Sequence, residues 1–181
     1  TKDYEILLQW SKVFLFNHSF TTFSGIKNSR ALLFPMESVF ESYIAQQIKK
    51  VFEPNDWEIS IQDKGYFLFT EPKEQFALRP DIVCQKGNRI IIMDTKWKNL
   101  ISNSRVNYGI SQSDMYQMYA YSKKYKTSEI WLLYPLNDEM RNHPEIKFES
   151  GDGTTVKLHF VDLVNIQRTM EELLAKLEVA N

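Results

Sequence analysis

Cysteine, long apolar runs and an excess of either charge are all scarce in this chain of 181 residues. Its single cysteine, Cys84, excludes a disulfide framework and a four-thiolate zinc site. No apolar run approaches the roughly 20 residues that cross a bilayer, and the N-terminal segment lacks the layout of a secretory signal. We therefore expect a cytoplasmic protein with no membrane partner.

The charge balance also excludes a general affinity for polyanions. The chain has 22 basic and 23 acidic side chains, a net charge of -1. Any nucleic acid would therefore have to bind a local basic patch. The composition, 43% apolar and 25% charged, is typical of a globular protein, and the length predicts one domain over residues 1–181.

Hydrophobic periodicity predicts an α/β fold. Apolar residues at helical spacing predict one helix ending near Asn17 and a second from about Pro35 to Phe52. Ser111 is a predicted N-cap for a helix reaching about Lys126, and Asp162 opens a last helix ending near Glu178. Short β-branched or aromatic segments predict strands at 57–61, 66–70, 80–84, 89–95, 129–135, 146–148 and 155–160. The order ααββββαβββα predicts a mixed β-sheet flanked by α-helices.

A tight turn brings two acidic residues together. The segment Lys86-Gly87-Asn88-Arg89 predicts a hairpin with a two-residue loop. If Lys86 faces Arg89, the same register places Asp81 opposite Asp94, with Cβ atoms roughly 4.5 to 5.5 Å apart. The two-residue period of a strand puts Lys96 on that face if the strand continues past Thr95.

Two adjacent carboxylates repel each other unless a cation lies between them, and hard oxygen donors suit Mg²⁺. Asp94 follows the apolar run IIIM, which is typical of a central strand, so the pair is expected at a sheet edge where ligands bind. The alternative is a turn cap at Asp81 and a surface ion pair between Asp94 and Lys96. The position after a central strand favours the metal site.

Pro80-Asp81, followed thirteen residues later by Asp94-Thr95-Lys96, resembles the signature of the PD-(D/E)xK nuclease superfamily. This implies a restriction-endonuclease-like core. The segments FESYI, LRPDIV, IMDTKWK, DMYQMYAY and LLYP further resemble McrC, the nuclease subunit family of the McrBC modified-cytosine restriction system. The resemblance runs from about Gly25 to Pro135. It implies that the chain is the C-terminal part of a longer protein.

The resemblance implies a role for each motif residue. Asp81, Asp94 and Glu41 would hold Mg²⁺, with Mn²⁺ as a substitute, and Lys96 would orient or activate water and stabilise charge on the phosphate. Asp94 stands where other superfamily members have Glu, which the pattern permits. Glu37 shares a helix face with Glu41, but its place in the first turn is equally explained by the helix dipole, so we choose Glu41.

The predicted third helix carries a second motif. Gln117 and Tyr121 match the Q-x-x-x-Y element of RecB-like nucleases, which supports the active site in those proteins. With Asp114 they form one stripe along the helix. The alternative for this stripe is a solvated helix face.

The stretch between Thr95 and Ser113 has no acidic residue. It carries potential phosphate-binding groups, and we predict DNA contacts from Lys98, Asn103, Arg105 and Tyr108. The alternative is a solvated loop.

Together these features predict a Mg²⁺-dependent endonuclease acting on double-stranded DNA, with an AAA+ GTPase of the McrB type as partner. A stand-alone restriction or repair nuclease, and a non-catalytic DNA-binding or assembly module, are the competing hypotheses. The oligomeric state stays open.

Overall fold

The computed structural model describes residues 35–179. The chain divides into two compact units, Thr1–Pro35 and Met36–Asn181, and the second contains every element described below. The predicted helix ending near Asn17 lies outside the described residues. Among the described residues, no helix is long and apolar enough to cross a membrane.

Three α-helices and two short 3₁₀ helices accompany the strands of this unit. The helices are α2 (Met36–Phe52), η1 (Glu53–Asn55), η2 (Ser104–Gly109), α3 (Gln112–Tyr125) and α4 (Ile166–Val179). The strands are β1 (Glu58–Ile61), β2 (Phe67–Phe69), β3 (Gln75–Ala77), β4 (Ile82–Lys86), β5 (Arg89–Thr95), β6 (Glu129–Pro135), β7 (Lys147–Glu149) and β8 (Thr155–Val161).

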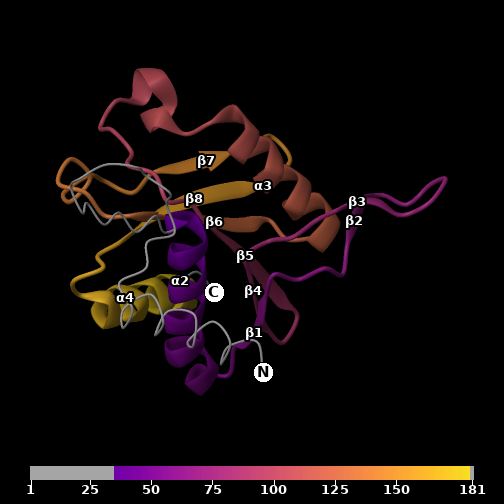
Figure 1. Cartoon of the computed structure of the whole chain (residues 1–181), viewed down its shortest axis with the longest axis horizontal. Helices are drawn as coiled ribbons and strands as arrows, with labels where there is room; N and C mark the ends of the chain where they lie inside the picture. The colour runs from indigo at the N-terminus through magenta and orange to yellow at the C-terminus, as the bar shows by residue number, and fades with distance from the viewer. Residues whose placement is uncertain (1–34, 180–181) are drawn as a thin grey trace, which may run out of the picture. The chain divides into compact units, whose positions relative to one another are not determined.

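A six-stranded mixed sheet forms the centre of the unit, in the order β1-β4-β5-β6-β8-β7. The inner strands β5, β6 and β8 are parallel, and the other neighbours pair antiparallel. Helices α2 and α4 pack on one face of the sheet and α3 packs on the other (Figure 1). The predicted α/β fold with a mixed sheet flanked by helices is confirmed, and it is compatible with a restriction-endonuclease-like core.

Strand β5 shows why the central segments are apolar throughout. Ile91 and Met93 pack toward α2 and α4, whereas Ile92 packs into the core beneath α3. A strand covered on both faces needs apolar residues at every position, not at alternate ones. The same alternation places Asp94, which follows Met93, on the face of the sheet that Ile92 shares with α3.

The predicted strand 66–70 does not join the main sheet, where the sequence placed it. Strand β2 pairs instead with β3, which the sequence did not predict, and the two form a separate hairpin that projects from the rest (Figure 1). Strand β3 has only three residues, and Phe76 at its centre is exposed and has a positive φ of 58°. It has no alternating pattern because no core packs against it.

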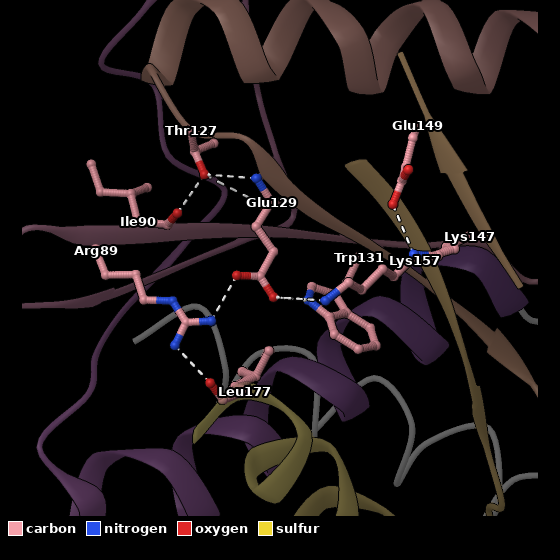
Figure 2. A network of polar contacts seen from close by, with 9 residues as sticks. All are labelled: Arg89, Ile90, Thr127, Glu129, Trp131, Lys147, Glu149, Lys157 and Leu177. Atoms are coloured by element: carbon pink, nitrogen blue, oxygen red, sulfur yellow. Dashed lines mark hydrogen bonds and ion pairs between the residues drawn. The ribbon is translucent and has the colours of Figure 1, made fainter. Parts of the chain in front are cut away.

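A polar network ties the end of α4 to the sheet (Figure 2). Arg89 donates one hydrogen bond to Glu129 Oε2 at 2.7 Å and another to the carbonyl of Leu177 at 2.6 Å. Trp131 Nε1 donates to Glu129 Oε1 at 3.1 Å, and Lys157 Nζ lies 3.5 Å from the same oxygen. Burial opposes ionisation of Glu129, but these donors hold its pKa below the ordinary value. The network fixes α4 against the sheet.

Candidate active site

Strands β4 and β5 form the predicted hairpin. Lys86 pairs with Arg89 across the two-residue loop, and the pairing continues without interruption to Ile82 opposite Met93. The predicted register is therefore confirmed. The tight loop fixes it, because a two-residue connection leaves no slack for a shift along the strands.

Asp81 and Asp94 lie one position beyond the last pair of this ladder. Val83 and Ile92 both pack into the core beneath α3. Because side chains alternate with a period of two, Asp81 and Asp94 emerge on that same face. Both aspartates line one cleft, so the two carboxylates come together as the register requires.

The Asp81 carboxylate is held in place by the neighbouring strand. Its Oδ2 accepts a hydrogen bond from the backbone N–H of Thr95 at 2.7 Å and another from the Thr95 hydroxyl, also at 2.7 Å. At this position a hydrogen bond to the Asp81 side chain takes the place of a backbone hydrogen bond between the two strands. The two bonds keep the end of β4 against β5 and fix the orientation of the Asp81 carboxylate.

Asp94 is almost completely buried, with 1% of its surface exposed. Burial first, and then the charge of Asp81, raise the pKa of Asp94 and Lys96 lowers it, with a net value of about 7. The Lys96 ammonium forms an ion pair with Asp94 Oδ2 at 2.5 Å. A buried carboxylate beside a second carboxylate is electrostatically costly, and a cation bound between them would relieve that cost.

The backbone of Lys96 extends the pairing of β5 with β6 by one residue. Its backbone N–H donates to the carbonyl of Leu133 on β6 at 2.9 Å, which keeps its side chain on the face of Asp94. Its Nζ also donates to Gln117 Oε1 at 3.2 Å. Burial alone would lower the pKa of Lys96, but Asp94 and the other nearby carboxylates raise it above the ordinary value, so the ammonium stays protonated.

Helix α3 supplies the other side of the site. It begins as predicted, with Ser111 Oγ accepting a hydrogen bond from the Asp114 N–H at 3.1 Å. Gln117 Nε2 donates to the hydroxyl of Tyr121 at 2.7 Å, and Tyr121 is buried. Lys96, Gln117 and Tyr121 therefore form one hydrogen-bonded chain, and the predicted stripe faces the site.

These groups surround a cleft of about 570 Å³. The lining residues come from α2, the ends of β4 and β5, the following segment and α3: Glu37, Glu41, Asp81, Asp94, Thr95, Lys96, Trp97, Lys98, Ser111, Asp114 and Gln117. The cleft is predominantly acidic, and Lys96 and Lys98 are its cationic side chains. A cation and a phosphate can thus both find partners within it.

Glu41 reaches the cleft but has a partner elsewhere. Its Oε1 accepts a hydrogen bond from Gln62 Nε2 at 2.7 Å. Within residues 35–179, no three His, Cys, Asp or Glu side chains are grouped closely enough to hold a metal. The two aspartates form the core of the possible donor set, and coordination by Glu41 stays a prediction. Glu37 lines the same cleft, so the cleft does not distinguish the two glutamates.

The family model of the McrBC 5-methylcytosine restriction system component matches residues 1–135, about three quarters of the chain. The chain belongs to this family. The match contains the elements from α2 to β6, including every lining residue of the cleft. The resemblance to McrC is thereby confirmed. No curated protein matches the chain.

The segment between β5 and α3 of this McrBC-family chain is more ordered than an irregular loop. Lys98 lines the cleft. Asn103 caps η2 by accepting a hydrogen bond from the Arg105 N–H at 3.0 Å, and the Tyr108 ring packs edge-on against His143 with centroids 5.3 Å apart. Asn103 and Tyr108 thus have structural roles. Lys98 is the one of the four predicted DNA contacts that lies in the cleft, and all four contacts stay predictions.

Two further residues of the site have roles that the motifs of this McrBC-family chain did not assign. Thr95 anchors Asp81, and Asp114 lines the same cleft as Lys96. The helical stripe placed Asp114 on the correct face without assigning it a function. The anchoring by Thr95 has no sequence signal, because the position between an aspartate and a lysine carries no requirement that can be read locally.

Proposed function

We propose that this chain is the Mg²⁺-dependent endonuclease of its restriction system and that it hydrolyses phosphodiester bonds of double-stranded DNA. One observation carries the proposal. Asp81 and Asp94 lie on one face at the end of adjacent strands, with the ammonium of Lys96 between Asp94 and α3. Two carboxylates and an ammonium on one face of a cleft are a set suited to phosphate chemistry.

The donor set fits Mg²⁺, with Mn²⁺ as a substitute. Mg²⁺ prefers oxygen ligands and is commonly held by one or two carboxylates, with waters and phosphate oxygens completing its shell. Asp81 and Asp94 supply those carboxylates, and the buried charge of Asp94 favours a cation. A divalent cation bound here would supply Lewis acidity toward the phosphate and toward a water.

The residues of the chain then act on the phosphate itself. A new bond forms between phosphorus and a water oxygen while the bond from phosphorus to one ester oxygen breaks, so no covalent enzyme intermediate is needed. The attacking water gives up a proton to solvent, and the departing ester oxygen takes up a proton from solvent to leave as an alcohol. Protonated Lys96 offsets negative charge that develops on the phosphate. Gln117 and Tyr121 hold the Lys96 side chain in position through their hydrogen-bonded chain.

For partners, we propose double-stranded DNA and an AAA+ GTPase of the McrB type that recognises modified cytosine. The family description, a component of a 5-methylcytosine restriction system, supports a division of labour between subunits. The charge of this chain supports it as well. A net charge of -1 provides little general attraction for DNA, so a partner that holds the duplex would complete the enzyme.

The test is cleavage of plasmid DNA carrying 5-methylcytosine, with Mg²⁺ or Mn²⁺, with and without the partner GTPase. We expect Asp94→Ala to lower the rate by ~100-fold or more, a loss of about 2.7 kcal/mol of transition-state stabilisation. The matched control is Glu171→Gln on the exposed face of α4, which should cleave like the parent.

Three results would contradict parts of this proposal. Equal cleavage by the parent and Asp94→Ala would exclude this site as the catalytic one. Cleavage that needs neither methylation nor the partner would favour the stand-alone nuclease. DNA or partner binding with no cleavage in any divalent metal would favour the assembly module.

A further inference from the structure

The Asp94 carboxylate has two roles that conflict. In the structure its Oδ2 pairs with the Lys96 ammonium at 2.5 Å, and it is also the buried oxygen donor of the proposed metal site. A dication and an ammonium at the same carboxylate repel each other strongly in a poorly solvated site. When a cation engages Asp94, Lys96 therefore needs another negative partner.

Asp114 is placed to be that partner. It lies in the first turn of α3, is half-buried and lines the same cleft as Lys96. Its charge raises the pKa values of both Asp94 and Lys96, so the three groups interact electrostatically. Within residues 35–179, its carboxylate makes no hydrogen bond or ion pair, although its backbone N–H is bonded to Ser111.

A second observation concerns Tyr134 on β6. Its side chain is fully buried, and its hydroxyl is without a hydrogen-bond partner among the described residues. Tyr134 belongs to the same buried core as Met118 of α3. Burial first, and then the charges of Asp114 and Asp94, raise the pKa of Tyr134. Buried hydroxyl groups rarely remain without a partner. Among the described residues, the core beneath α3 thus holds an unused donor, and the cleft holds an unused acceptor at Asp114.

Gln117 provides the path between the two partners. Its Oε1 already accepts from Lys96 Nζ at 3.2 Å, and it lies one helical turn after Asp114 on the same stripe of α3. The ammonium can therefore move from Asp94 toward Asp114 while it keeps its bond to Gln117. The movement needs only rotation within one long, flexible side chain.

Resting on the proposed function, we propose that Asp114 is a positioning residue, which receives the ammonium of Lys96 when a divalent cation binds Asp94. Asp114 then holds Lys96 toward the phosphate. Metal binding and the placement of Lys96 are thus one coupled event, and Asp114 need not touch the metal.

The test is a double-mutant cycle on Mg²⁺ affinity without DNA, measured by calorimetry and by the Mg²⁺-induced shift in unfolding temperature. The four proteins are the parent, Asp114→Asn, Lys96→Met and the double variant. We expect Asp114→Asn to weaken Mg²⁺ binding roughly tenfold, within the range of couplings between neighbouring groups. In the Lys96→Met background, Asp114→Asn should weaken Mg²⁺ binding by less than about twofold, because no ammonium competes for Asp94.

Two further variants control for charge and for fold. Glu171→Gln removes one negative charge from the exposed face of α4, outside the cleft, and should change Mg²⁺ affinity by less than about twofold. Asp114→Glu keeps the charge and should restore most of the affinity, which separates the loss from a folding defect. Tyr134→Phe should raise the unfolding temperature of the metal-free protein, because it removes the unpaired hydroxyl.

Equal losses of Mg²⁺ affinity from Asp114→Asn in the parent and in Lys96→Met would overturn the inference. Asp114 would then be a metal ligand, or its negative charge would attract the metal without any part played by Lys96. A loss from Glu171→Gln as large as that from Asp114→Asn would overturn it too, because the loss would then follow from net charge alone. A parent that binds Mg²⁺ without cleaving DNA would contradict the proposed function and leave the coupling intact. A parent that does not bind Mg²⁺ would overturn both.

Discussion

Replacing Asp94 with asparagine should make the metal-free protein less sensitive to rising pH. The buried Asp94 has a pKa raised from 3.8 to about 7, so the folded state holds this proton more tightly than the unfolded state does. Below about pH 4 both states are protonated and the group makes no difference. Above about pH 7 both are ionised, and the folded state bears the full cost of the buried charge. The contribution of Asp94 to the free energy of unfolding is therefore lost as pH rises from about 4 to about 7.

The size of the effect follows from the shift. Each pKa unit corresponds to about 1.36 kcal/mol, so a shift of roughly three units costs about 4 kcal/mol once Asp94 is fully ionised. The side chain is almost fully buried, so solvent screening requires no discount. Between pH 5 and pH 8 the remaining part of this cost is about 2 to 3 kcal/mol. Asp94→Asn should gain that amount over the parent across this interval.

The assay is urea unfolding of the parent and Asp94→Asn at pH 5 and pH 8 in the presence of EDTA. Comparing the two proteins at each pH cancels other titrating groups, including Glu129. The matched control is Asp138→Asn, the same chemical change at an exposed aspartate, which should show no difference that depends on pH.

Saturating Mg²⁺ should stabilise the parent at pH 8 by about 2.7 kcal/mol at a hundred times its dissociation constant, and should leave Asp94→Asn unchanged. Equal pH dependence of the parent and Asp94→Asn in EDTA would refute the reasoning. It would mean that Lys96 neutralises Asp94 completely or that water reaches the carboxylate.

Two further predictions concern DNA binding and the anchoring of α4. If Lys98 and Arg105 contact phosphates, replacing both by alanine should make the plot of log affinity against log salt shallower by about 1.8, measured in Ca²⁺ to prevent cleavage; an unchanged slope would exclude this segment as a DNA contact. Glu129→Gln should destabilise the protein by about 2 to 3 kcal/mol in urea unfolding, because Arg89 and Lys157 lose their charged partner, and should leave Mg²⁺ affinity unchanged. Parent-like stability would show that the network in Figure 2 contributes nothing.

The features that could be predicted from the sequence are local ones. The β4–β5 register follows from a two-residue turn, and with it the shared face of Asp81 and Asp94. The start of α3 follows from the Ser111 cap, and its polar stripe from the helical period. Each of these rests on residues close together in the chain, whose geometry the backbone constrains without help from distant segments.

The features that sequence reasoning missed depend on contacts between distant segments. The short strand β3 exists because β2 pairs with it, and nothing in its own three residues indicates a strand. The burial of Asp94 requires α3 and β6 to close around the end of β5. The bond from Lys96 to Leu133 requires the parallel pairing of β5 with β6. The charge state of Asp94 arises only in that packed environment, because solvation and electrostatic fields depend on every group nearby, whatever its place in the sequence.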